Sequence, residues 1–200
     1  MKKTWLCLLL LLVSASVSAV EWPPVKGKPF PDLELVNQDG KRIHLTDFKG
    51  KVILVEVVGM TCPACNAFSG AQTRGGYQKT QPQSDLSSIK SYFAQYAGVK
   101  WNDPRVVYVQ ILLFGMNMKT PSADDARKWA AHFDFKTQQQ EYVFAGVDVF
   151  LNPANYGASY DMIPGFFLVD KSFVVRSVST GHHPKESLYE NLLPMVPKLF

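Results

Sequence analysis

The sequence predicts a single α/β domain folded as a layered sandwich. Apolar runs typical of buried strands alternate along the chain with segments whose apolar residues recur at helical spacing. The series ends in a strand hairpin and a helix, and this order is typical of an α/β sandwich. Residues 20–200 have the length and apolar content of one domain with a sizeable core, and they show neither an internal repeat nor a second block of composition.

The first residues have the features of a secretion signal. Lys2 and Lys3 form a positive start, residues 6–13 form an apolar core that is short for a membrane span, and residues 14–19 are small. We therefore expect residues 1–19 to be removed as a signal peptide, which would leave residues 20–200 as the mature domain. An uncleaved N-terminal anchor is the alternative.

Removal of the signal peptide would change the cysteine count and the net charge of the mature chain. Of the three cysteines, Cys7 would leave with the signal, so only Cys62 and Cys65 would remain, which excludes a framework of several disulfides. Loss of two lysines lowers the formal net charge from +4 to +2, and no basic run is present, so nucleic acid is not an expected partner. We expect a periplasmic protein without a stable membrane span after cleavage.

Seven strands are expected, and each follows from its residue types. Residues 22–31 form an extended, proline-containing lead to the first of them. The Asp39-Gly40 pair then indicates a hairpin turn between two short strands. The long β-branched and aliphatic runs further on are typical of strands buried on both faces of a sheet, and the last two strands form an antiparallel pair. The expected strands are residues 33–36, 41–45, 51–58, 105–113, 142–148, 166–170 and 173–179.

Four helices are expected among these strands. The segment 85–97 has apolar residues at helical spacing, with Ser84 as its N-cap and Gly98 as its stop. The segment 122–133 carries two aspartates in its first turn, where the helix dipole favours negative charge. The other two expected helices are residues 62–68, directly after the third strand, and residues 184–193.

The Cys62-Pro63-Ala64-Cys65 motif carries the chemistry that the sequence predicts. It follows a buried strand and opens a helix, so the two thiols lie one helical turn apart, where the helix N-terminus favours a thiolate. Such a pair can exchange a disulfide with a partner or bind a soft metal. An inert disulfide staple is a further alternative, although so short a loop would stabilise the fold weakly.

Glu56 is the only charged residue between Val52 and Cys62. Burial of an unpaired carboxylate is costly, so we expect a raised pKa for Glu56. The alternative is a side chain at the sheet edge that points into solvent.

Two segments of the chain carry a resemblance to a known family. Residues 40–55, followed by the Cys-Pro-Ala-Cys motif, resemble the secreted thioredoxin-like reductases of the TlpA/ResA type. Residues 156–157 and 163–170, with the sequence Ile-Pro-Gly-Phe-Phe-Leu-Val-Asp in the latter, resemble the second signature of that family. Gly181 and the helix expected after it resemble the end of the family's domain.

The resemblance implies a thioredoxin-like three-layer sandwich with an N-terminal hairpin extension. Relative to this family, the chain carries a long helical insertion after the active-site helix, at about residues 69–103. Within the site the resemblance implies that Cys62 attacks a disulfide, that Cys65 resolves the mixed disulfide, and that Glu56 exchanges a proton with Cys65. The implied activity is reduction of protein disulfides in the periplasm, with no cofactor and no metal.

The resemblance implies a substrate groove as well. Pro164 would form a cis peptide bond with Ile163, face the cysteine pair and leave the backbone of Ile163 free to pair with an extended peptide. Thr61 and Pro63 would line the same groove. The implied partners are protein thiols and disulfides, together with a membrane electron donor that recharges the pair.

Three features depart from the family pattern. Thr61 stands where the family carries tryptophan and is closer to the periplasmic disulfide isomerases, which leaves an oxidase or isomerase role open. Gly165 replaces a threonine, which predicts a wider groove. In the insertion, residues 69–84 are rich in Gly, Gln, Ser and Thr and are expected to be mobile, whereas the helix 85–97 either helps to select a partner or has no role.

Other functions of the cysteine pair stay open. Residues 59–65 also match the Gly-Met-Thr-Cys-x-x-Cys motif of heavy-metal-associated domains, and two thiolates suit Cu(I). A copper carrier with a thioredoxin fold needs a distant histidine, for which the adjacent pair His182 and His183 is available. A peroxidase is disfavoured because Gly59 stands where such enzymes carry threonine. A redox-inert binding module is the remaining alternative.

Overall fold

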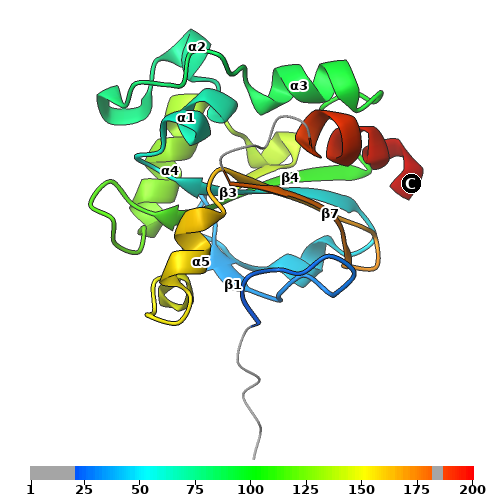
Figure 1. Cartoon of the computed structure of the whole chain (residues 1–200), viewed down its shortest axis with the longest axis horizontal. Helices are drawn as coiled ribbons and strands as arrows, with labels where there is room; N and C mark the ends of the chain where they lie inside the picture. Colours follow the sequence, from blue (N-terminus) through cyan, green and yellow to red (C-terminus); the bar gives the residue numbers. More distant parts are fainter. Residues whose placement is uncertain (1–20, 182–186) are drawn as a thin grey trace, which may run out of the picture.

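The computed structural model describes residues 21–181 and 187–200 (Figure 1). The predicted signal peptide, residues 1–19, lies outside the described residues, as do His182, His183 and the start of the predicted C-terminal helix. Within the described ranges, no helix is both long enough and apolar enough to cross a membrane.

A five-stranded mixed sheet forms the centre of the molecule. Its strand order is β5-β4-β3-β6-β7. β3 pairs in parallel with β4, and β4 with β5, whereas β6 is antiparallel to both β3 and β7. All five predicted long strands are present, at β3 (Val52–Gly59), β4 (Val106–Phe114), β5 (Glu141–Ala145), β6 (Gly165–Val169) and β7 (Val175–Thr180).

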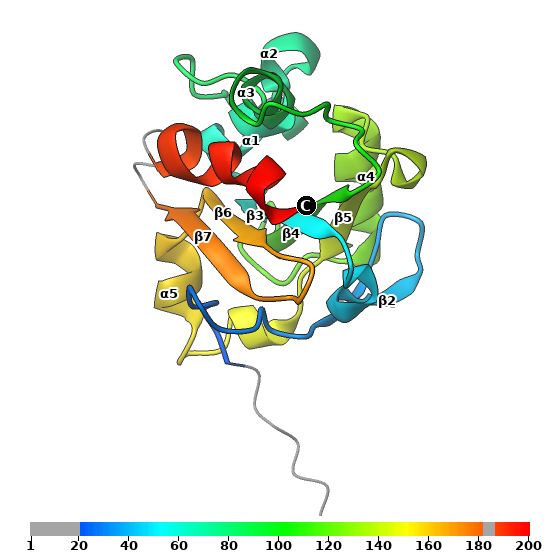
Figure 2. The same cartoon turned by 90° about the vertical axis from the view of Figure 1, so that its right-hand side faces the viewer.

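Helices cover both faces of this sheet (Figures 1 and 2). The β3–β4 and β4–β5 connections step across the sheet in one direction, so right-handed crossovers place their helices on one face. The β5–β6 connection returns in the other direction and places α5 on the opposite face. The first face carries α1 (Pro63–Ser69), α3 (Ile89–Tyr96), α4 (Ala123–Phe133) and the C-terminal turns Ser187–Leu192 and Leu193–Leu199, and the second carries α5 (Tyr156–Asp161).

The side chains of β3 alternate between two cores, one on each face of the sheet. Leu54 and Val58 pack in the core beneath α1, α3 and α4. Ile53 and Val57 pack in the opposite core with the N-terminal lead, the hairpin and α5. The helices on one face, the central sheet, and the lead, hairpin and α5 on the other face form three layers, which confirms the predicted three-layer sandwich.

The predicted N-terminal hairpin is also present. β1 (Glu34–Val36) and β2 (Arg42–His44) are antiparallel, and Leu35 lies opposite Ile43. The Asn37 side chain closes the turn, because its Oδ1 accepts the backbone N–H groups of Asp39 (3.0 Å) and Lys41 (2.9 Å). Ahead of the hairpin, the lead is extended, as the sequence predicts, and it hydrogen-bonds to the start of β7.

Two boundaries differ from the prediction by three residues or more, and one predicted helix differs in type. α3 begins at Ile89 rather than residue 85, because the hydroxyl of Ser88, not Ser84, caps it by accepting the N–H of Ser91 at 3.2 Å. β5 ends at Ala145 rather than residue 148, because the chain turns into a short 3₁₀ segment at Asp148–Phe150. The C-terminal segment forms one wide helical turn and then 3₁₀ turns, since two prolines in Leu193–Leu199 remove the N–H groups of an α-helix.

The insertion at residues 69–103 packs on the domain, including residues 69–84, for which the composition predicts a mobile segment. It contains α2 (Ala71–Arg74) and α3. Tyr77 is buried against Trp129, with ring centroids 5.2 Å apart, and its N–H donates to Asn66 Oδ1 at 2.8 Å. These contacts hold the first part of the insertion against α1 and α4.

The second part of the insertion is held by Glu141, a fully buried carboxylate on β5. Its Oε1 pairs with Lys90 Nζ of α3 at 2.5 Å and accepts the indole N–H of Trp101 at 2.6 Å. Its Oε2 accepts the backbone N–H of Lys136 at 2.9 Å. A single side chain of the sheet therefore fixes both the helix and the end of the insertion.

We expect Glu141→Ala to lower the free energy of unfolding by about 3 kcal/mol, because an ammonium, an indole N–H and a backbone N–H all lose their acceptor. Urea unfolding measures this. The control is Glu34→Ala, which removes a carboxylate paired with Arg42 on the surface and should change the same quantity by less than about 1 kcal/mol. Equal effects of the two substitutions would contradict the assignment.

Candidate functional site

Cys62 stands at the carboxyl end of β3, where the chain turns into α1. It is the N-cap residue of the helix, and Pro63 occupies the first helical position, where a missing N–H leaves nothing unpaired. The turn is closed by the N–H of Cys62, which donates to the carbonyl of Gly59 at 3.0 Å. Cys62 Sγ accepts the backbone N–H of Cys65 at 3.1 Å, so a sulfur takes the place of a capping oxygen.

The two cysteines are free thiols with opposite pKa shifts. Hydrogen bonds from the thiol and the N–H of Cys65 lower the pKa of Cys62, against the opposing effect of burial. Burial raises the pKa of Cys65 well above its usual range, and the neighbouring Cys62 raises it further. Cys62 is also partly accessible, whereas Cys65 is fully buried. The thiolate of the pair therefore forms first on Cys62.

Glu56 is completely buried in β3, on the face that packs under α1. Its Oε2 accepts hydrogen bonds from the hydroxyl of Tyr108 and from Nε2 of Gln110, the latter at 3.0 Å. Burial raises the pKa of Glu56 from 4.5 to about 7, although both hydrogen bonds act in the other direction. The charge of Glu56 in turn raises the pKa of Cys62 and of Cys65, so the three groups titrate within one electrostatic site.

Gln110 and Tyr108 belong to this site, and the sequence analysis missed both. Gln110 lies directly opposite Glu56 in the parallel pairing of β3 and β4, and it also bonds Ser69 Oγ at 2.8 Å and the indole of Trp129 at 2.9 Å. Their signal in the sequence is weak but present: two polar side chains two positions apart in an apolar run share one face of a strand.

Asn66 is a third residue that the sequence analysis missed. It is buried in α1, and its Nδ2 donates to the carbonyls of Met60 (3.1 Å) and Cys62 (2.9 Å). Since its Oδ1 accepts the N–H of Tyr77, one amide connects the loop before the reactive cysteine with the insertion.

A groove of about 300 Å³ opens beside Cys62. Thr61, Pro63, Ile163 and Pro164, the four residues predicted to bind substrate, all line it. The remaining lining residues are Ala64, Gln83, Leu86, Phe114, Met118 and Tyr160. The four predicted residues thus lie around one groove. The sequence also allowed for a helix of the insertion that selects a partner, and Leu86 falls in that predicted segment, whereas Phe114, Met118 and Tyr160 were not predicted.

The Ile163–Pro164 peptide bond is cis, as the resemblance implies. The backbone N–H of Ile163 is not free, however, because it donates to the carbonyl of Tyr160 at 3.3 Å. The expectation that the backbone of Ile163 is free to pair with an extended peptide is therefore wrong for its N–H, which the end of α5 already uses, and stays a prediction for its carbonyl.

The chain matches one protein family model over part of its length. The Redoxin family model matches residues 25–69, which include both cysteines and end with α1. No curated protein sequence matches the chain.

Among solved structures, the thioredoxin domain of a thiol-disulfide oxidoreductase from Bacteroides vulgatus has a TM-score of 0.53 and 16% identity, with 87% of this chain and 99% of that chain covered. A thiol:disulfide interchange protein from Bacteroides sp. has a TM-score of 0.52 and 15% identity, with coverage of 87% and 91%. BsSco, of the Sco family of cytochrome c oxidase assembly proteins, has a TM-score of 0.55 and 15% identity, with coverage of 88% and 95%. The fold is thioredoxin-like.

In this thioredoxin-like fold, Gly165 does not widen the groove. An added Cβ at Gly165 would lie 2.4 Å from the carbonyl oxygen of Met162 and 2.9 Å from a methyl group of Val57. The glycine is therefore required by close packing behind Pro164, and the prediction that it opens the groove is wrong.

Metal ligands do not gather in the described part of the chain, where no group of three or more His, Cys, Asp or Glu side chains is placed to hold an ion. His44 lies at the surface near Asp32 and Glu34, and His132 contacts the carbonyl of Gly75. Neither approaches the cysteine pair, and His182 and His183 lie outside the described residues.

The buried carboxyl predicts a pH-dependent stability. Because the pKa of Glu56 is raised to about 7 in the folded protein, the folded state holds a proton that the unfolded chain releases near pH 4.5. The free energy of unfolding should therefore fall as pH rises between these values, by on the order of 3 kcal/mol. The measurement is urea unfolding between pH 5 and pH 8, in a background where both cysteines are replaced by serine. The free energy of unfolding should fall with pH in this background protein, and the fall should be absent when Glu56→Gln is added. Parallel pH profiles for the two proteins would show that Glu56 ionises normally.

Proposed function

We propose that this protein is a thiol–disulfide oxidoreductase that reduces disulfides of other proteins in the periplasm. One observation carries the proposal: a partly accessible thiol with a lowered pKa and a buried thiol with a raised pKa stand one turn apart beside a groove. Such a pair is suited to attack first with one sulfur and then to release the product with the other. The thioredoxin-like fold and the Redoxin match across the motif support the same chemistry.

The reaction consists of two exchange steps. The Cys62 thiolate attacks one sulfur of a substrate disulfide, a Cys62–substrate disulfide forms, and the other substrate sulfur leaves as a thiolate that takes up a proton. The Cys65 thiolate then attacks Cys62 Sγ, the mixed disulfide breaks, and the second substrate thiol is released. The substrate has gained two electrons and the pair has become a disulfide, so a membrane electron donor must return two electrons before the next cycle.

Glu56 is proposed to take the proton from Cys65. Burial raises the pKa of Cys65, so its attack needs a base close by. With a pKa of about 7, Glu56 exists in both protonation states near neutral pH, which suits both acceptance and return of a proton. Only its Oε2 is occupied by Tyr108 and Gln110, and its Oε1 has no hydrogen-bond partner among the described residues.

The charges around the pair favour the reducing direction. A strong oxidant needs a dithiol form that is stabilised as a thiolate. Here hydrogen bonds from Cys65 lower the pKa of Cys62, but burial and the negative charge of Glu56 oppose this effect. The described residues that line the groove include no lysine, arginine or histidine, so no cation of the lining adds to the stabilisation of the thiolate, which supports the reducing direction.

Cys65→Ser should trap covalent complexes, because Cys62 can still attack and nothing releases the mixed disulfide. Reduced Cys65→Ser protein incubated with an oxidised protein extract should give complexes that are visible by non-reducing electrophoresis and vanish on reduction. Cys62→Ser, the matched control, should give none, because its remaining thiol is buried. If both variants trapped alike, or neither did, the assigned order of attack would be wrong.

The direction is tested by the reduction potential of the pair, measured by equilibration with glutathione. We expect a value close to about −270 mV, that of thioredoxin, whereas a value near about −120 mV would identify an oxidase. The same titration with Cu(I) present covers the copper alternative. Tight Cu(I) binding by a pair that resists oxidation would overturn the redox assignment.

A further inference from the structure

Exposed apolar side chains gather at one edge of the groove. Among the described residues, four large apolar side chains are exposed: Val25 (48%), Met118 (37%), Tyr156 (42%) and Tyr160 (50%). Met118 and Tyr160 line the groove. Tyr156 stacks on Tyr160 at 6.4 Å, and both rings contact Phe114, which also lines the groove, at 5.5 Å and 6.1 Å. Apolar side chains that collect around a reactive group indicate a surface for a partner.

The insertion supplies the other wall of the groove. Gln83 and Leu86 line the groove, and the N–H of Gln83 donates to the carbonyl of Pro63 at 3.1 Å. The carbonyl of Leu86 accepts a hydrogen bond from Gln72. Figures 1 and 2 show the insertion above α1 and α5 on the other side of the sheet, so the two walls approach the start of α1 from opposite sides.

The chemistry of these walls restricts the occupant. Apart from the Cys62 thiolate, the described lining residues include no charged side chain, and the other polar groups are those of Thr61, Gln83, Tyr160 and the backbone. The volume of about 300 Å³ is at the lower end of ligand-sized pockets and has room for a few side chains rather than a folded domain. Methionine and tyrosine are residues that adapt to apolar partners and are enriched at protein interfaces.

We propose that the groove binds a cysteine-containing segment of a partner protein whose residues beside the cysteine are large and apolar. The insertion and the patch of Met118, Tyr156 and Tyr160 select this segment over segments with charged neighbours. The proposal rests on the disulfide exchange proposed above and names the class of substrate for it. Its specificity comes from burial of apolar side chains next to Cys62 at the moment of attack.

The test uses short peptides that carry one cysteine as a mixed disulfide with thionitrobenzoate. The Cys62 thiolate attacks the peptide sulfur, the peptide–Cys62 disulfide forms, and thionitrobenzoate leaves as a coloured thiolate, so absorbance gives the rate constant. Four peptides differ only in the two residues beside the cysteine. These are leucine and phenylalanine in the apolar peptide, and two glycines, two lysines or two glutamates in the other three. We expect the apolar peptide to react about tenfold faster than the glycine peptide, and the charged peptides to react no faster than glycine.

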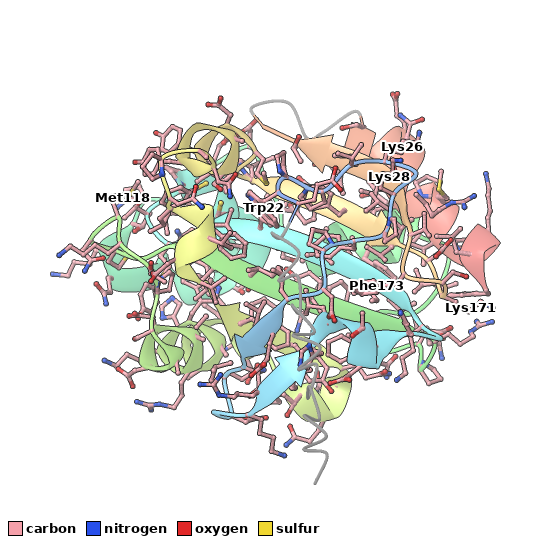
Figure 3. The ribbon with its side chains drawn as sticks, turned by 90° about the horizontal axis from the view of Figure 1, so that it is seen from below. Trp22, Lys26, Lys28, Met118, Lys171 and Phe173 are labelled. Carbon is pink, nitrogen blue, oxygen red and sulfur yellow. The ribbon has the colours of Figure 1, made fainter. Side chains whose placement is uncertain are left out.

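The double variant Met118→Ser/Tyr160→Ser should bring the ratio of the apolar to the glycine rate constant close to one. Both side chains are exposed, so circular dichroism should show an unchanged fold. Val25→Ser is the matched control: it removes an equally exposed apolar side chain from the N-terminal lead, which Lys26 and Lys28 mark in Figure 3 well apart from Met118. This control should keep the ratio of the unmodified protein.

The outcomes separate this inference from the proposed function. Equal rates for all peptides, or faster reaction of a charged peptide, would overturn the groove proposal while leaving disulfide exchange in place. No reaction with any peptide, together with no trapping by Cys65→Ser, would overturn the proposed function itself. Sedimentation of the reduced protein covers a remaining occupant: a dimer that Met118→Ser/Tyr160→Ser dissociates would mean that a second copy covers the patch, and this also would overturn the proposal.

Discussion

The hydrogen bonds around the Glu56 carboxyl hold together the parts of the molecule on which the site depends. Glu56 comes from β3, Tyr108 and Gln110 come from β4, and Gln110 continues to Ser69 at the end of α1 and to Trp129 in α4. Each of these polar groups is buried, and a buried group that loses its partner costs about 1–3 kcal/mol. The network therefore fixes α1 on the sheet and, through α1, the position of the reactive sulfur at its first turn.

The same buried carboxyl lowers the stability of the fold relative to an apolar residue at this position. Glu56 lies in a strand whose other residues are all buried and apolar apart from the terminal glycine, and its Oε1 has no partner among the described residues. Selection for stability alone would replace such a group, because burial without full hydrogen bonding is unfavourable. The proton exchange proposed for Glu56 would account for its presence, since a group with a pKa of about 7 exists in both protonation states near neutral pH.

The sequence predicts those features that local patterns specify. An apolar run with a single carboxylate, followed by two cysteines at the start of a helix, is sufficient to predict the burial of Glu56 and the placement of the pair. The roles of Tyr108 and Gln110 could not be predicted from local patterns. Their contact with Glu56 depends on strand register, which pairs Gln110 with a residue fifty-four positions earlier in the chain. The cap of α3 was misplaced for a different reason: Ser84 and Ser88 have equal capping chemistry, and tertiary packing of the insertion decides between them.

The insertion also shows how composition can mislead. Its glycine, glutamine and serine content predicts a mobile loop, yet a few polar side chains anchor it. The amide of Asn66 holds the carbonyls of Met60 and Cys62 with one end and the backbone of Tyr77 with the other. Since Gln83 bonds the carbonyl of Pro63 in the reactive turn, the insertion is tied to that turn at two points. The groove wall is therefore held by hydrogen bonds to the same stretch of backbone that surrounds the Cys62 thiol.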